Sequence, residues 1–218
     1  MKRAVIFDCD GTLVDGQAAI CDTMEEAFAA AGLPCPDRNE VRRMVGLSLP
    51  QALRLLAPNA SEEQRSIALD AYKTSYRERR MSGALQEPLY DGIHALIERL
   101  VAARYLLGVA TGKSDRGLQS CLETHGIGQH FVTLQTADRH PSKPHPAMLE
   151  QALEEAGVDA VHAVMIGDTT FDIEMAANAG VRAIGVAWGY HEPRELLAAG
   201  AVAVAHTMDE LETLIHAG

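Results

Sequence analysis

The chain has 218 residues, of which 47% are hydrophobic, and a formal net charge of -11. This length suffices for one folded domain, or for one domain that carries a second as an insertion. The acidic balance argues against nucleic acid or an anionic membrane as a partner, because both bind through clustered Lys and Arg. No apolar run reaches membrane-spanning length and the N-terminus lacks a signal-peptide pattern, so we expect a cytoplasmic protein, either a monomer or a homodimer.

Short apolar runs typical of β-strands recur along the chain, at residues 4–7, 105–110, 131–135, 163–167, 182–187 and 201–205. They are continuous rather than alternating, as in strands that are covered on both faces. Helical patterns lie between them at residues 92–103, 116–126, 146–157 and 172–180, and three of these four end in Gly. Strands and helices in alternation predict an α/β fold with a doubly wound parallel sheet.

The interval from about residue 16 to residue 87 breaks this alternation. It contains helical patterns at residues 18–32, 49–57 and 61–80, with no convincing strand between them. An all-helical block after the first strand is best explained as an insertion. We therefore predict a core domain of residues 1–15 and 88–218, with an inserted α-helical cap domain over residues 16–87.

Two carboxylates follow the first predicted strand, in the stretch "AVIFDCDGTLVD". In an open parallel sheet the functional crevice lies beyond the carboxyl ends of the strands. Side chains two apart on an extended segment point the same way, so Asp8 and Asp10 could share one pocket there. Buried charges are costly unless they are paired or hold a metal, and these two acids therefore need a structural partner or a chemical task.

Three more polar clusters follow later strands. Thr111 and Gly112 come after the strand at 105–110 and begin a helix, which suits an anion. Lys143 lies between prolines after the strand at 131–135, where its ammonium could point at a phosphate or a carboxylate. Asp168 ends the strand at 163–167, and Asp172 lies near the start of the next helix, where it could simply be a helix cap.

Taken in order, "DCDGT", Thr111, Lys143 and "GDTTFD" resemble the four motifs of the haloacid dehalogenase (HAD) superfamily of phosphohydrolases. The helical block stands where that family carries its inserted cap, so the resemblance covers essentially the whole chain. It implies that Asp8 is the nucleophile, which forms an aspartyl-phosphate, and that Asp10 is the general acid and later the base. It also implies Mg²⁺ held by Asp8, Asp168 and the backbone carbonyl of Asp10, all of which are hard oxygen donors.

The resemblance assigns roles to the remaining motif residues too. Thr111 and the amide of Gly112 would hold the phosphoryl oxygens, and Lys143 would offset the charge on Asp8 and on the transferring group. Asp172 would steady Lys143 or a metal-bound water. The presence of Asp10 favours phosphate esters as substrates, because the dehalogenases of small haloacids lack this second acid.

The substrate is expected to be a small phosphorylated metabolite. The segment "GDTTFDIEMAANAGVRAIGVAWGYH" is similar to the phosphoglycolate phosphatase branch, which has a helical (C1-type) cap. Arg42 and Arg43 precede the cap loop "VGLSLPQAL" and could bind a substrate carboxylate, although adjacent residues on a helix face different directions. Sugar-phosphate phosphatases, β-phosphoglucomutase-like enzymes and small pyrophosphatases share the motifs and stay open as alternatives. A non-catalytic binding protein of this fold is disfavoured, because no motif residue is missing.

Overall fold

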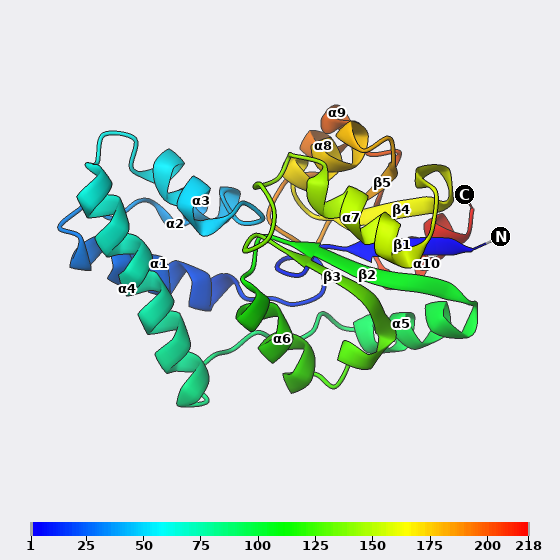
Figure 1. The fold of residues 1–218 in the computed structure, drawn as a ribbon, viewed down its shortest axis with the longest axis horizontal. Coiled ribbons are helices and arrows are strands. Elements are labelled where there is room, and N and C mark those ends of the chain that lie inside the picture. Colours follow the sequence, from blue (N-terminus) through cyan, green and yellow to red (C-terminus); the bar gives the residue numbers. More distant parts are fainter. Residues whose placement is uncertain (1, 218) are drawn as a thin grey trace.

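The computed structural model describes residues 2–217 and places a sheet domain beside a helical domain (Figure 1). Within these residues the sheet has six parallel strands, in the order β3-β2-β1-β4-β5-β6. The strands are β1 (Arg3–Phe7), β2 (Tyr105–Thr111), β3 (Phe131–Thr136), β4 (Ala163–Gly167), β5 (Arg182–Val186) and β6 (Ala203–Ala205). The predicted doubly wound parallel sheet is confirmed.

Helices cover both faces of this sheet. One face carries α5 (Ile93–Ala102), α6 (Asp115–Thr124) and α10 (Met208–His216), and the other carries α7 (Ala147–Ala156), α8 (Thr170–Asn178) and α9 (Pro193–Ala199). Val5 and Phe7 of β1 pack on the first side, whereas Ala4 and Ile6 pack on the second. Because both faces are buried, the strand sequences are continuously apolar. Among the helices of residues 2–217, none is both long and apolar enough to cross a membrane.

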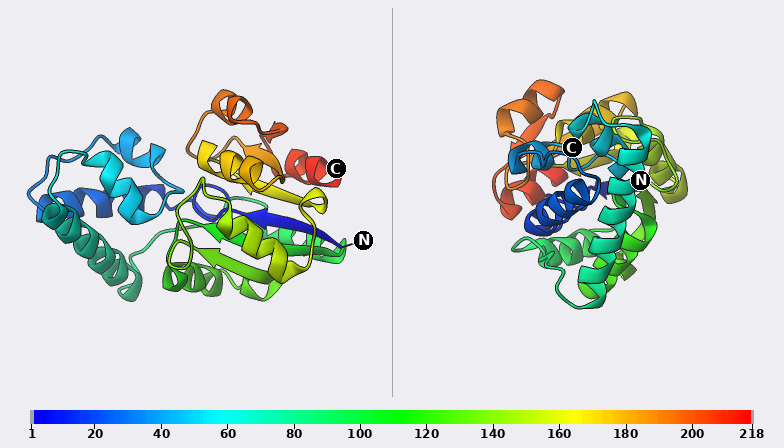
Figure 2. Two further views of the ribbon diagram at one scale, coloured as in Figure 1. Left: turned by 45° about the horizontal axis from the view of Figure 1, so that its top comes forward. Right: turned by 90° about the vertical axis from the view of Figure 1, so that its left-hand side faces the viewer.

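The helical cap stands beyond one end of the sheet domain, opposite the N-terminus (Figure 2). It consists of α1 (Gln17–Ala30), α2 (Arg38–Arg43), α3 (Leu49–Leu56) and α4 (Glu62–Met81), which pack around their own apolar core. The segments that enter and leave the cap run side by side. Val14 forms an antiparallel bridge with Leu89, and the Asp15 amide donates to the Pro88 carbonyl at 2.8 Å. The chain thus passes between the sheet and the helical cap at these paired segments, and the division into residues 1–15 with 88–218 and residues 16–87 stays a prediction.

Direct contacts hold the cap against the carboxyl ends of the strands. The amide of Ser48 in the cap donates to Ser142 Oγ in the core at 2.8 Å. Arg43 of α2 forms an ion pair with Glu195 of α9, with a nitrogen–oxygen distance of 2.9 Å. The loop before α3 also lies on the backbone of Gly112. The cap is therefore closed over the strand ends in this structure.

Candidate active site

The strand ends bring most of the predicted site residues to one place. Asp8 follows β1 at the centre of the sheet, Thr111 ends β2 on one side, and Asp168 follows β4 on the other. A cavity of about 1250 Å³ between core and cap is lined by Asp8, Asp10, Thr111, Gly112 and Lys143, among others. Asp168 and Asp172 are not among its described lining residues, but Asp172 accepts a hydrogen bond from Lys143, and carboxylate oxygens of Asp168 and Asp8 lie within 4.8 Å of each other. The four clusters of the sequence thus form one site.

Lys143 is fully buried and is paired with two carboxylates. Its Nζ atom lies 2.9 Å from Asp8 Oδ1 and donates a hydrogen bond of 2.6 Å to Asp172 Oδ1. Burial opposes the charge of this lysine, but Asp172 and Asp8 outweigh it, so the pKa of Lys143 is raised. The other oxygen of Asp172 accepts hydrogen bonds from the amide and hydroxyl of Thr169, the N-cap residue of α8. Asp172 therefore both caps a helix and fixes the lysine.

Asp168 is held in a narrow space between two glycines. A Cβ atom at Gly11 or Gly189 would collide with its side chain, so both backbones approach the carboxylate closely. Its oxygens accept hydrogen bonds from Thr12 Oγ1 at 2.8 Å and from the Tyr190 amide at 3.0 Å. Burial, together with the neighbouring carboxylates, raises its pKa well above the usual value. Thr12 was not predicted as a site residue, although it belongs to the "DGT" turn.

The acids around Asp8 fit a divalent cation. Carboxylate oxygens of Asp8, Asp168 and Asp172 lie within 4.8 Å of one another. Asp8 Oδ2 is buried and has no hydrogen-bond partner among residues 2–217. Burial raises the pKa of Asp8 to about 7, so a second cation beside Lys143 would favour its charged form. Because Asp172 already accepts from three donors, Asp8 and Asp168 are the carboxylates best placed to ligate Mg²⁺.

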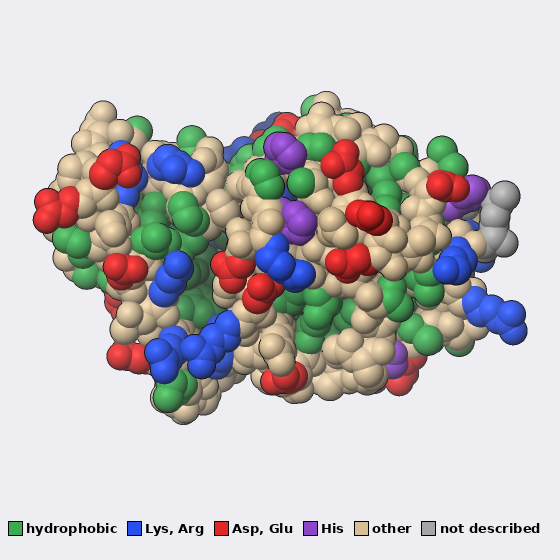
Figure 3. Space-filling view, in the orientation of Figure 1, with side chains coloured by type: hydrophobic (Ala, Val, Ile, Leu, Met, Phe, Trp, Pro, Cys, Tyr) green, Lys and Arg blue, Asp and Glu red, His purple; other side chains and the backbone are tan. Residues whose placement is uncertain are grey.

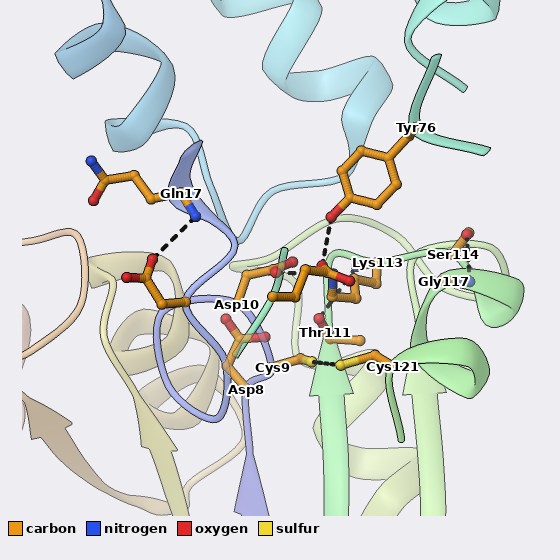
Figure 4. Close-up of polar contacts among 12 residues, drawn as sticks. Asp8, Cys9, Asp10, Gln17, Tyr76, Thr111, Lys113, Ser114, Gly117 and Cys121 are labelled. Atoms are coloured by element: carbon orange, nitrogen blue, oxygen red, sulfur yellow. Dashed lines mark hydrogen bonds and ion pairs between the residues drawn. The ribbon is translucent and has the colours of Figure 1, made fainter. Parts of the chain in front are cut away.

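Asp10 has a different set of partners, drawn in Figure 4. Its Oδ1 atom lies 2.9 Å from Lys113 Nζ, and that lysine lies 2.5 Å from Glu87 Oε1. Tyr76 of the cap donates its hydroxyl to the same Glu87 oxygen at 2.5 Å. Burial opposes the charge of Lys113, but Asp10, Tyr76 and Glu87 outweigh it and raise its pKa. Lys113, Glu87 and Tyr76 were not predicted as site residues. The sequence contains one signal for them, a lysine that directly follows Thr111 and Gly112 at a strand end.

Arg42 and Arg43 are not brought to the cavity. Arg43 instead reaches across the outside of the cap to Glu195, and neither arginine is among the described residues that line the cavity. Val41 of α2 and Met44 just after it do line the cavity, so α2 lies beside the cavity but directs Arg43 toward Glu195 of α9. The cations that do line the cavity, besides Lys113 and Lys143, are Arg54, Lys73, Arg77, Arg80 and Arg116.

Comparisons with known proteins agree with this geometry. The model of the haloacid dehalogenase-like hydrolase family matches residues 5–186. A protein of Dickeya dadantii named probable phosphatase IndB is 36% identical over 100% of this chain and 95% of its own length. A phosphoglycolate phosphatase of Vibrio parahaemolyticus is 28% identical and covers 96% of this chain and 94% of itself. A crystal structure from Clostridium acetobutylicum, described as a predicted phosphatase, matches with a TM-score of 0.89 and 27% identity over 100% of both chains. The chain therefore belongs to the haloacid dehalogenase-like hydrolases, the family that its motifs resemble.

Proposed function

We propose that this protein is a Mg²⁺-dependent phosphatase that cleaves a small phosphorylated acid through Asp8, with phosphoglycolate as the first candidate. One observation carries the proposal. Asp8 is a buried carboxylate with an unpartnered oxygen, and it opens onto a cavity beside a fixed lysine and a second metal-ligating acid. The family and the name of the Dickeya dadantii relative support the phosphatase class, and four relatives at 28–33% identity that are named phosphoglycolate phosphatase support phosphoglycolate.

The proposed reaction begins with attack of Asp8 on phosphorus, which displaces the leaving oxygen. Lys143, 2.9 Å from Asp8, offsets the charge that gathers on the transferring group. The Thr111 hydroxyl oxygen accepts a hydrogen bond from the Lys113 amide, which leaves its proton free to bind a phosphoryl oxygen. Asp10 gives a proton to the leaving oxygen and then takes one from the water that hydrolyses the aspartyl-phosphate.

Mg²⁺ would be held by Asp8 and Asp168, with the backbone carbonyl of Asp10 as the further protein ligand expected from the family resemblance. When bound, it supplies positive charge that lets an anionic nucleophile approach an anionic phosphate. The protein also contributes the closed cap, because excluding bulk water strengthens these electrostatic interactions.

The charge of the cavity supports an acidic substrate. Lys73, Arg77 and Arg80 follow one another at helical spacing along α4 and all line the cavity, as do Arg54 and Arg116. Among the described residues none of these five forms an ion pair with an acid, although the chain carries a net charge of -11. Lys and Arg side chains gather where the lower end of α4 meets the core (Figure 3). These cations favour a second anionic group on the substrate.

The cavity size adds a constraint on the substrate. Its volume of about 1250 Å³ exceeds the range of roughly 300–1000 Å³ that is usual for small-molecule pockets. Phosphoglycolate alone would leave much of it to water. Longer phosphorylated acids therefore belong in the same test.

The test measures kcat/KM with Mg²⁺ and, separately, after dialysis against EDTA. The panel contains phosphoglycolate, longer phosphorylated acids, hexose 6-phosphates, β-glucose 1-phosphate, pyrophosphate and a phosphopeptide. Phosphorylated acids are expected to be the best substrates, and EDTA is expected to abolish turnover until Mg²⁺ is returned. If a sugar phosphate leads by tenfold, about 1.4 kcal/mol, the acid assignment is wrong and the phosphatase class stands. Full activity in EDTA would contradict the metal assignment.

A further inference from the structure

A chain of four polar side chains joins the cap to Asp10 (Figure 4). It runs from Tyr76 on α4, through Glu87 in the segment that leaves the cap, to Lys113 after β2 and Asp10 after β1. The three links measure 2.5, 2.5 and 2.9 Å. Side chains from three separate parts of the chain, around residues 10, 76–87 and 113, therefore meet in one connected network.

The middle of this network is buried and charged. The side chains of Lys113 and Glu87 are 7% and 8% exposed. A buried ion pair gives little net stability, and removing one partner leaves an uncompensated charge. A contribution to folding stability therefore explains poorly why this ion pair lies beside the site. The contact between Lys113 and Asp10, the residue that we expect to transfer the proton, explains it better.

We propose that Lys113, Glu87 and Tyr76 are positioning residues that hold the carboxyl group of Asp10 for proton transfer once the cap is closed. Lys113 contacts Oδ1 of Asp10, which leaves Oδ2 to carry the proton. As the phosphorus–oxygen bond breaks, that proton moves to the leaving oxygen, and the resulting carboxylate is stabilised by Lys113. This inference rests on the proposed phosphatase function and adds residues to the proton-transfer step.

The cap takes part through Tyr76. Tyr76 and Glu87 both fall within the predicted cap of residues 16–87, whereas Lys113 follows β2 of the core, so the ion pair between Glu87 and Lys113 is the link that joins the two domains. Glu87 also directly precedes the crossing where Asp15 pairs with Pro88, so it lies at the base of the cap. Closure of the cap thus completes the network from Tyr76 to Asp10. Proton transfer by Asp10 would then be most efficient while the cap encloses the substrate.

The test compares two substrates in the Mg²⁺-loaded enzyme. An alkyl phosphate needs a proton on its leaving oxygen, whereas p-nitrophenyl phosphate has a leaving group that is stable without one. Tyr76→Phe and Lys113→Met should lower kcat/KM for the alkyl phosphate at least tenfold more than for p-nitrophenyl phosphate. Lys113→Arg, which keeps the charge, should restore part of this loss.

Tyr72→Phe is the matched control. Tyr72 stacks on Tyr76, with 5.6 Å between ring centroids, and its hydroxyl makes no hydrogen bond within residues 2–217. It should leave the ratio between the two substrates unchanged. Equal losses on both substrates in Tyr76→Phe and Lys113→Met would overturn the inference and make the network purely structural. If Lys113→Met fails to fold, Tyr76→Phe and Glu87→Gln decide. A wild-type enzyme inactive on every phosphate ester would instead refute the proposed function.

Discussion

The backbone of Gly112 lies directly beneath the cap loop, so Gly112→Ala tests whether the closed cap is needed for turnover. A Cβ atom at this position would stand 2.5 Å from the Leu47 carbonyl oxygen and 2.7 Å from that of Gly46. Both are backbone atoms that cannot rotate away, so the cap loop must retreat by ~1 Å to reach ordinary contact. A misplacement of that size can cost about 10²-fold in rate.

The substitution keeps the amide that we assign to phosphoryl binding and changes the contact with the cap loop. We expect kcat/KM for the best substrate to fall about 100-fold, with thermal stability close to wild type. Gly128→Ala is the control, because a Cβ there would lie 3.5 Å from Leu122 Cβ, an ordinary contact. Activity of Gly112→Ala within threefold of wild type would refute the reasoning. It would show that the close contact between Gly112 and the cap loop is not required for turnover.

Three further substitutions test the site and the core. Asp8→Asn should abolish turnover and weaken the rise in melting temperature that Mg²⁺ gives to the wild type; a preserved rise would remove Asp8 from the metal site. Asp10→Asn should lower turnover by about 10² to 10⁴ and leave the rise intact, and an unchanged rate with an alkyl phosphate would contradict its role. Leu96→Ala should cost about 2–5 kcal/mol in denaturant unfolding, because Leu96 is fully buried under the sheet. Its control, Leu197→Ala, removes a side chain that is 51% exposed and should cost far less.

The sheet could be predicted because its determinants are local in sequence. The central strands are buried on both faces, so each appears as a short continuous run of apolar residues. The motif acids could be placed for the same reason, since Asp8 and Asp168 directly follow such runs. Parallel strands bring their carboxyl ends to one edge of the sheet. This rule was enough to predict that the motif residues lie together.

The cap contacts could not be predicted in the same way. Tyr76, Glu87 and Lys113 meet only because α4 folds back against the core, and nothing in the sequence gives that docking angle. For Arg42 and Arg43, conversely, the sequence predicted a contact with the cavity that the structure does not show. Their position before the cap loop favoured a role in the cavity, yet Glu195 of α9 stands within 2.9 Å of Arg43 on the outer side. The direction in which a short helix presents its side chains depends on partners that are distant in the chain.

Asp8 and Asp10 are two residues apart and line one cavity, but the structure gives each its own cation. Lys143 pairs with Asp8 and with Asp172 behind it, next to Asp168, so this acid belongs to the group that fits a metal. Lys113 pairs with Asp10 and Glu87, on the side that faces the cap. Different surroundings can give two neighbouring carboxylates different chemical roles, which is consistent with the nucleophile and proton donor that we propose. The division also explains why the strand ends in charge: each acid is held by a buried lysine from a different loop, and an isolated acid at either position would carry the full cost of burial.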